Sequence, residues 1–183
     1  MGDISTRGME PPIGSRPLVE VDEVTVRRAQ HGDAAALDQL VRSLMPYLGR
    51  ICGAIALDAG DDALQNTMIA ITKNLPSLRE PAALRGWARR IAVREAVRVA
   101  RVGRSIPVDP NTLRPPPVPD GATAVEVRAL LDQLGPEHRA ALVLRHLDGL
   151  DEAEMAEVLG VAPGTVKSRL HRARGAFRER WIK

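Results

Sequence analysis

The sequence has little cysteine, few aromatic residues and no long apolar run. Its single cysteine, Cys52, excludes an internal disulfide and a cysteine-based zinc cluster within the 183 residues. The best apolar run, Ile51–Leu57, already contains a glycine and is much shorter than the roughly 18 residues of a membrane span. Residues 1–5 lack the basic start and apolar core of a secretory signal. These absences predict a protein of the reducing cytoplasm, with no membrane insertion.

Positive charge is present but unevenly distributed. The whole chain has a net charge of only +3. Residues 71–104 carry nine Lys or Arg against two Glu, and residues 163–183 carry seven against one. The remainder of the chain is therefore acidic. Two basic segments on an acidic chain predict two polyanion-binding surfaces, although solvated helix faces would give the same pattern.

Proline and glycine divide the chain into four parts. Residues 1–21 have prolines and glycines without apolar periodicity, which predicts a flexible tail. Residues 22–102 show helical patterning throughout and no strand-type alternation. Six prolines in residues 103–121 predict a flexible linker. Four helices are expected in residues 122–183, so the predicted fold is all-α, with two small helical domains joined by a Pro-rich linker.

Two acidic residues are expected to begin helices in the first domain. Asp33 is a suitable N-cap for a helix running toward Met45, which Pro46 is expected to end. Asp61 is suited to cap a helix through Leu75. In that second helix, four apolar residues recur at helical spacing and predict a buried stripe: Leu64, Met68, Ile71 and Leu75.

The carboxyl-terminal part has the form of a helix-turn-helix. Asp151 is the expected N-cap of a short helix to Leu159, Gly160 turns the chain, and Pro163 suits the first turn of a second helix. One face of that second helix is apolar. The remainder is small, hydrogen-bonding or basic, as a major-groove reader requires: Gly164, Thr165, Lys167, Ser168, Arg169, His171, Arg172 and Arg174.

These motifs resemble a known family. The runs Leu134–Leu150, Ala153–Val161 and Gly164–Arg174 closely resemble the fourth domain of bacterial sigma factors of the extracytoplasmic-function (ECF) group. The resemblance implies that this domain reads the −35 promoter element as duplex DNA. It also implies core RNA polymerase, through its β′ clamp and β flap, and promoter DNA as partners. An anti-sigma factor that masks both domains occurs in many members, and the sequence neither shows nor excludes one.

Residues 61–71 resemble the helix of the second sigma domain that docks on the polymerase clamp. Opposite the predicted buried stripe, Ile69 is an apolar residue among carboxylate and amide neighbours, a composition that suits a protein partner. By the resemblance, the candidate polymerase contacts are Asp62, Gln65, Asn66 and Ile69. Asn66 stands where the family usually has a carboxylate.

Residues 87–96 resemble the family helix that melts the promoter and reads the −10 element. Four arginines recur along one side of this helix and can follow a phosphate backbone. Together with neighbours placed by the resemblance, the candidate −10 residues are Arg79, Trp87, Arg90, Arg94, Arg98 and Arg101. Aromatic rings usually hold unstacked bases, yet Met68 and Leu78 stand where the family often has aromatics, and Arg94 where it often has Asn.

Two other classes of protein are a DNA-binding regulator and an enzyme. The departures just named keep open a helix-turn-helix regulator that binds DNA without polymerase-dependent melting. An enzyme is disfavoured because the histidines are scattered, no Gly-rich phosphate loop occurs and Cys52 lies in an apolar helix. The sequence predicts no cofactor and no metal site. Two small cores on a flexible linker predict domains whose relative position is open.

Overall fold

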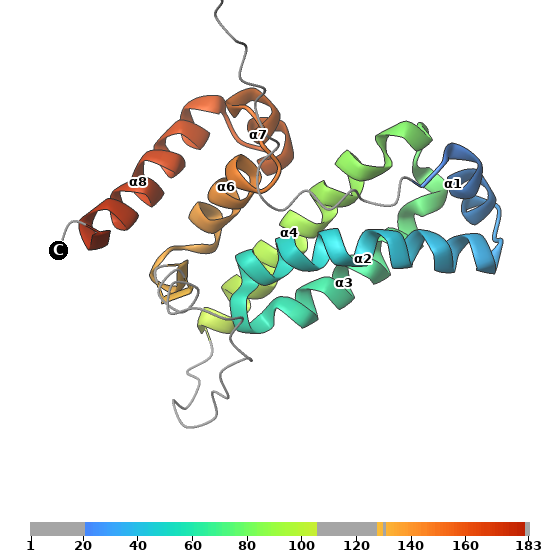
Figure 1. The fold of residues 1–183 in the computed structure, drawn as a ribbon, viewed down its shortest axis with the longest axis horizontal. Coiled ribbons are helices and arrows are strands. Elements are labelled where there is room, and N and C mark those ends of the chain that lie inside the picture. The colour runs from blue at the N-terminus through green and yellow to red at the C-terminus, as the bar shows by residue number, and fades with distance from the viewer. Residues whose placement is uncertain (1–20, 106–127, 130, 182–183) are drawn as a thin grey trace, which may run out of the picture.

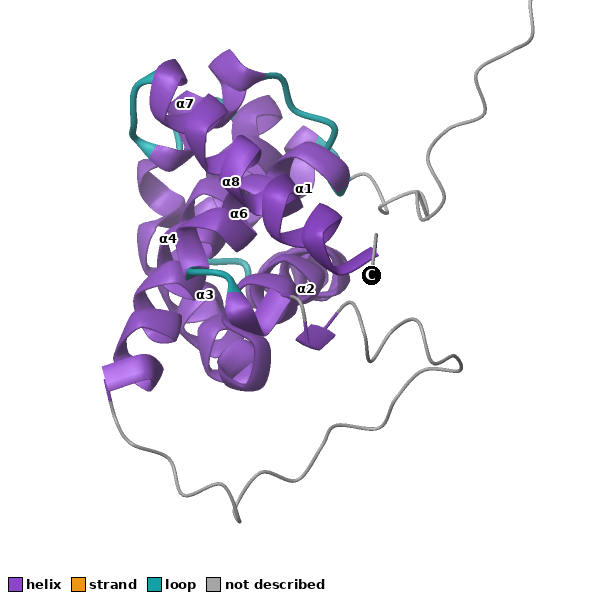
Figure 2. Cartoon of the chain, turned by 90° about the vertical axis from the view of Figure 1, so that its left-hand side faces the viewer, coloured by secondary structure: helices purple, strands orange, loops and turns teal. Residues whose placement is uncertain are grey.

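The computed structural model describes residues 21–105, 128–129 and 131–181, and their regular structure is entirely helical (Figures 1 and 2). The four amino-terminal helices are called the α1–α4 bundle: α1 (Glu23–Gln30), α2 (Ala34–Ala56), α3 (Gly60–Asn74) and α4 (Leu84–Ser105). Short 3₁₀ turns connect them: η1 (Leu57–Ala59), η2 (Leu75–Ser77) and η3 (Pro81–Ala83). The carboxyl-terminal helices are called the α6–α8 unit: α6 (Pro136–His146), α7 (Glu152–Leu159) and α8 (Pro163–Trp181).

Aspartates begin the first two helices. The Asp22 carboxylate accepts a hydrogen bond from the Thr25 amide at 2.6 Å, and Asp33 accepts from the amides of Ala35 and Ala36 at 3.0 Å. These backbone donors lower the pKa of both carboxyl groups. The prediction that Asp33 caps a helix is confirmed.

The prediction that Pro46 ends this helix is wrong, because α2 continues through it to Ala56. A proline inside a helix costs about 3 kcal/mol through its lost N–H donor and its clash with the preceding turn. The residues around it offset that cost, since Leu44, Tyr47, Leu48 and Ile51 are all at most 5% exposed. Each fully buried side chain of this size contributes roughly 1.5–3 kcal/mol.

The start and the buried face of α3 differ from the predictions. The helix begins at Gly60, with Asp61 and Asp62 in its first turn and no side-chain cap. Two residues of the predicted stripe, Ile71 and Leu75, are buried as expected. Leu64 and Met68 are only half-buried against the core, and Ala63 and Thr67 are fully buried instead. The close approach of α2 explains the rotation. A Cβ on Gly60 would lie 2.8 Å from the Gly53 Cα, so small residues form this contact.

The helix-turn-helix forms as predicted. Asp151 and Glu154 make a reciprocal capping box at the start of α7. Gly160 ends α7 in the left-handed conformation, with φ of 64°. Pro163 is the first residue of α8. The tail 1–20 and the linker beyond Ser105 lie outside the described residues, as does most of the helix predicted before Leu134.

The α1–α4 bundle and the α6–α8 unit pack against each other and share one apolar core. Helix α6 contacts α2 and α4, and α7 contacts α4; the two views agree that these helices lie side by side (Figures 1 and 2). The expectation that the relative position of the domains is open therefore differs from the structure, in which the described residues form a closed arrangement.

One helical stretch, Ala34–Ser77, is long and apolar enough to cross a membrane by length and composition alone. Core helices of soluble proteins meet the same test. Here Leu40, Leu48, Ile51 and Ile55 have no exposed surface and point into the shared core. Burial within the fold accounts for their hydrophobicity.

Candidate nucleic-acid interface

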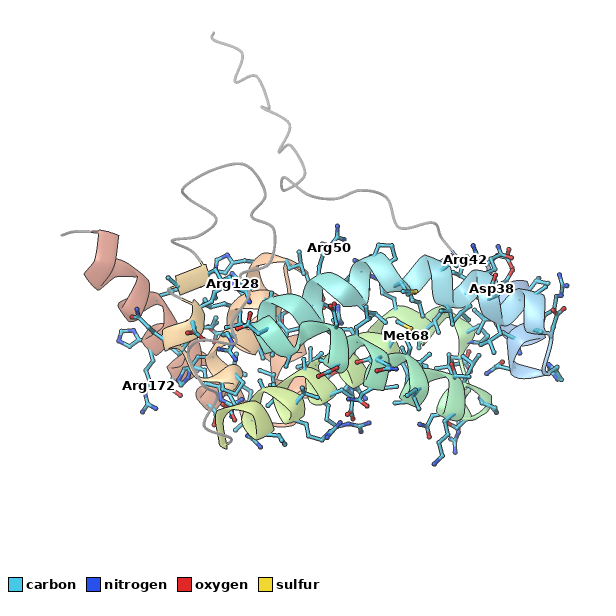
Figure 3. The ribbon with its side chains drawn as sticks, turned by 90° about the horizontal axis from the view of Figure 1, so that it is seen from below. Asp38, Arg42, Arg50, Met68, Arg128 and Arg172 are labelled. Atoms are coloured by element: carbon cyan, nitrogen blue, oxygen red, sulfur yellow. The ribbon has the colours of Figure 1, made fainter. Side chains whose placement is uncertain are left out.

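The outward surface of α8 is built on a buried apolar side. Val166, Leu170 and Ala173 are at most 2% exposed, which fixes the rotation of the helix against α6 and α7. Gly164, Lys167, Ser168, His171 and Arg172 are then exposed, as predicted, with Thr165 and Arg169 half-buried beside them. Figure 3 shows Arg172 extending from α8 into solvent. We call the exposed five the α8 face.

Two of the predicted α8 residues lie apart from this face. Arg174 lines an apolar groove of about 840 Å³ between α2 and α6, together with Arg50. Arg169 lines a different groove, of about 760 Å³, between α4 and α7. Beneath the helix, burial together with Arg169 and Arg172 lowers the pKa of His138, which keeps a neutral ring next to the basic helix.

A row of exposed arginines follows one side of α4: Arg90, Arg94, Arg98 and Arg101. We call this row the α4 stripe. Carboxylates partly neutralise it. Arg98 Nε lies 2.8 Å from Glu95 Oε2 and Arg94 Nε lies 3.5 Å from Glu95 Oε1. Arg101 Nε donates a hydrogen bond of 2.6 Å to Glu137 on α6.

The α4 stripe faces the α6–α8 unit. All four arginines line the groove of about 760 Å³ whose other wall contains Glu137, Glu157 and Arg169. Of the predicted α8 residues, Arg169 also lines this groove, whereas the α8 face lies outside it. Arg79 is exposed and lies in the loop before η3, and Trp87 is half-buried against the core.

The predicted polymerase contacts lie on α3. Asp62, Gln65 and Ile69 are exposed, while Asn66 is half-buried. Ile69 is 59% exposed and is one of few large apolar side chains at the surface of the described residues. An exposed apolar side chain flanked by polar groups is the composition of a protein-binding anchor.

Several polar residues connect the bundle to the α6–α8 unit, and the sequence analysis did not identify them. The Tyr47 hydroxyl donates to Asp148 Oδ2 at 2.8 Å, and Arg89 Nη1 lies 3.4 Å from the same oxygen. Buried Arg139 donates from Nε to the Ile55 carbonyl at 2.6 Å. Arg128, which precedes the α6–α8 unit, pairs with Asp58 in η1. The sequence carries no signal for these pairs, because their partners are tens of residues apart.

Metal ligands and the single cysteine were the sequence features most relevant to catalysis. The described residues contain no cluster of three or more His, Cys, Asp or Glu side chains able to hold a metal ion. Burial raises the pKa of Cys52 to about 11, which keeps the thiol protonated at neutral pH. As predicted, Cys52 is a core residue.

Comparison with known proteins identifies the family. A family model for sigma-70 region 4 matches residues 124–177. The chain is 36% identical over 179 residues to the ECF RNA polymerase sigma factor SigM of Mycobacterium tuberculosis, covering 91% of each chain. This chain belongs to the ECF sigma factors. It is also 33% identical to the ECF sigma factor SigE of Mycolicibacterium smegmatis, over 81% of this chain and 63% of that one.

Solved structures show the same all-helical fold. CnrH in complex with the cytosolic domain of CnrY superposes on this sigma factor with a TM-score of 0.63 and 22% identity, covering 89% of this chain and 98% of that one. RpoE in complex with the anti-sigma factor NepR from Bartonella quintana gives a TM-score of 0.57 and 21% identity, covering 78% and 94%. The predicted fold class and family are confirmed.

Proposed function

We propose that this sigma factor binds core RNA polymerase and directs it to promoters through two separate DNA contacts. In this proposal the α8 face reads the −35 element as duplex, and the α4 stripe with Trp87 and Arg79 holds the melted −10 element. Helix α3 docks on the polymerase clamp through Asp62, Gln65, Asn66 and Ile69. The protein has no catalytic chemistry of its own and acts in the cytoplasm.

The α8 face carries the first part of this proposal. Lys167 and Arg172 are exposed on α8, whose orientation is fixed by its buried side and by the capping box of α7. Both side chains are therefore positioned to enter a DNA major groove. Arginine and lysine read guanine edges or hold phosphates, and Ser168 and His171 add hydrogen-bonding groups. Membership of the ECF sigma factors supports the proposal that the DNA bound by α8 is promoter DNA.

The division into domains follows from the same proposal. Residues 22–102 would form sigma domain 2, residues 122–183 sigma domain 4, and residues 103–121 the linker between them. The two solved relatives were determined in complex with CnrY and NepR, which supports the proposal that an anti-sigma factor also regulates this chain.

Run-off transcription tests the proposed function. Core RNA polymerase would be supplied with the promoter upstream of the protein's own gene, with and without the purified chain. A transcript that depends on the protein is expected. Polymerase binding without a transcript would point to the wrong promoter or to a melting defect. Loss of both would favour the alternative, a DNA-binding regulator that does not act with polymerase.

A further inference from the structure

The groove of about 840 Å³ between α2 and α6 lies outside the surfaces proposed to bind DNA and polymerase. Aliphatic side chains from α6 and from the segment before it form its walls: Leu131, Leu142, Val143 and Leu147. Leu147 is 40% exposed, so this apolar wall is open to solvent. Small-molecule sites in proteins have volumes of about 300–1,000 Å³ and are mostly apolar. The groove has the size and the lining of such a site.

Two glycines, Gly49 and Gly53, line the α2 side of the groove. Glycine inside a helix is destabilising relative to alanine. Gly53 has no positive φ, and a Cβ at this position would project into open space. The close contact between α2 and α3 requires glycine at Gly60, because only there would a Cβ meet the backbone of the other helix. Neither backbone conformation nor packing therefore requires Gly53, and its missing side chain keeps the groove open.

The charged side chains that line this groove are all basic. Arg50 from α2 and Arg174 from α8 are exposed, and no Asp or Glu is among the described residues of the lining. Neither arginine forms an ion pair with another described residue. Figure 3 shows Arg50 extending from α2 into solvent. Two guanidinium groups beside an apolar surface complement a ligand that has one anionic head and an apolar remainder.

His146 adds a third polar group to the lining. Burial, together with Arg174 and Arg145, lowers the pKa of His146. Its ring is therefore mostly neutral at neutral pH and offers a hydrogen bond without a further charge. The charge of the lining comes from the two arginines.

The lining favours a small aliphatic molecule over a protein partner. Ten described residues line the groove, whereas a stable protein interface uses about 20–30 residues a side. No aromatic ring is among these ten residues, so the lining suits an alkyl chain better than a planar ring system. Arginine binds carboxylates through two parallel hydrogen bonds. An alkyl carboxylate combines the two parts that the groove complements.

We propose that this groove binds a free fatty acid, with its alkyl chain between α2 and α6 and its carboxylate held by Arg50 and Arg174. The proposal gives Arg174 a ligand other than DNA, in agreement with its position apart from the α8 face. The site does not rest on the proposed function, because neither DNA nor polymerase takes part in it.

Calorimetric titration of the full-length chain with dodecanoate, below its micellar concentration, tests the site. Hexanoate has the same head and is expected to bind at least about tenfold more weakly, because fewer methylene groups are buried. Dodecyltrimethylammonium has the same chain with a positive head. It should also bind at least about tenfold more weakly, because the arginines repel it.

Variants locate the ligand within the groove. Arg50→Gln should weaken dodecanoate binding by about fivefold, and the double variant with Arg174→Gln by about 20-fold or more. Arg42→Gln is the matched control and should stay within about twofold of the unmodified chain. It removes the same charge from the same helix, at the end away from α8 (Figure 3). Gly53→Leu fills the groove, keeps both arginines and should weaken binding by at least about tenfold.

Four results would overturn the proposal. Equal losses in Arg50→Gln and Arg42→Gln would show that net charge, and not the groove, attracts the acid. Unchanged binding in a folded Gly53→Leu chain, checked by helical circular dichroism, would place the alkyl chain elsewhere. No binding of dodecanoate would leave the groove to a protein partner, and a tenfold preference for dodecyl phosphate would assign it to another amphiphile. If Gly53→Leu does not fold, the comparison of Arg50→Gln with Arg42→Gln decides.

Discussion

The α8 face and the α4 stripe look alike in sequence and differ in structure. Both come from segments with a large excess of arginine and lysine. The α8 face leaves Lys167 and Arg172 exposed on the outside of the molecule, whereas the α4 stripe is paired with Glu95 and Glu137 and lines a groove. Net charge along a sequence therefore measures the potential for polyanion binding, and tertiary structure decides how much of it is available.

The largest effect on DNA affinity is expected from substitutions in the exposed α8 face. Replacing both Lys167 and Arg172 by Ala should weaken promoter-duplex binding by roughly 100-fold, since each good base or phosphate contact contributes about 1–3 kcal/mol. Fluorescence anisotropy with the labelled promoter measures this loss. Binding to core polymerase should stay intact. Loss of polymerase binding in the same variant would refute the assignment of separate surfaces.

The exposed apolar residue Ile69 on α3 provides a reference for the two basic surfaces, because its proposed partner is a protein. Ile69→Glu on α3 should weaken core-polymerase binding by about tenfold or more, as expected for an apolar anchor. Val24→Glu is the matched control, because Val24 is 67% exposed and lies on α1. Polymerase affinity should also depend less steeply on salt than duplex binding does, because fewer counterions are released. Equal loss in both variants, measured by a polymerase pull-down titration, would contradict a specific anchor.

Alkaline pH should weaken the closed arrangement through Tyr47. Burial, reinforced by Asp148, raises the pKa of this tyrosine from 10.0 to about 12. The neutral hydroxyl is thus favoured in the folded chain; its stabilisation is complete below about pH 10 and is lost as the pH rises toward 12. Between about pH 9 and pH 11 the free energy of unfolding should fall by roughly 1 kcal/mol more in the unmodified chain than in Tyr47→Phe. Urea titrations of both chains at the two pH values measure this difference. An equal fall in the free energy of unfolding in both chains would contradict the prediction.

The smallest effect on DNA affinity is expected from a substitution in the α4 stripe. Arg101→Ala should change single-strand affinity of the free chain by less than about threefold, because its guanidinium already pairs with Glu137. Arg90→Ala, at the other end of the stripe, is the matched comparison and should cost more. Anisotropy with an unstructured oligonucleotide measures both, and the reverse order would show that the Glu137 pair does not compete with phosphate.

Local signals allowed much of this molecule to be predicted. Asp33, Asp151, Gly160 and Pro163 mark helix ends through their own backbone chemistry, and the structure places each as expected. Pro46 was misleading because the burial of its neighbours outweighs its local cost. The rotation of α3 depends on a Gly53–Gly60 contact with another helix, which helical periodicity alone does not reveal.

The α8 face and the α4 stripe could be predicted from the sequence, because each is formed by residues of a single helix. Periodicity alone placed the exposed residues of α8 and the arginine row of α4. The carboxylates opposite that row, and the Asp148 contact, come from segments far away in the sequence. Tyr47 and Asp148 are 101 residues apart, so their approach depends on how the two units pack.

The Arg139–Ile55 hydrogen bond also has a consequence for synthesis of the chain on the ribosome. The Ile55 carbonyl lies at the end of α2 and receives its Arg139 donor from 84 residues later. At a translation rate of about 5–20 residues per second, that donor emerges roughly 4–17 s after the carbonyl. During this interval the nascent bundle presents to the cell the side of α2 and α4 that α6 later covers. A nascent-chain chaperone would meet this sigma factor at that uncovered side, before the second unit exists.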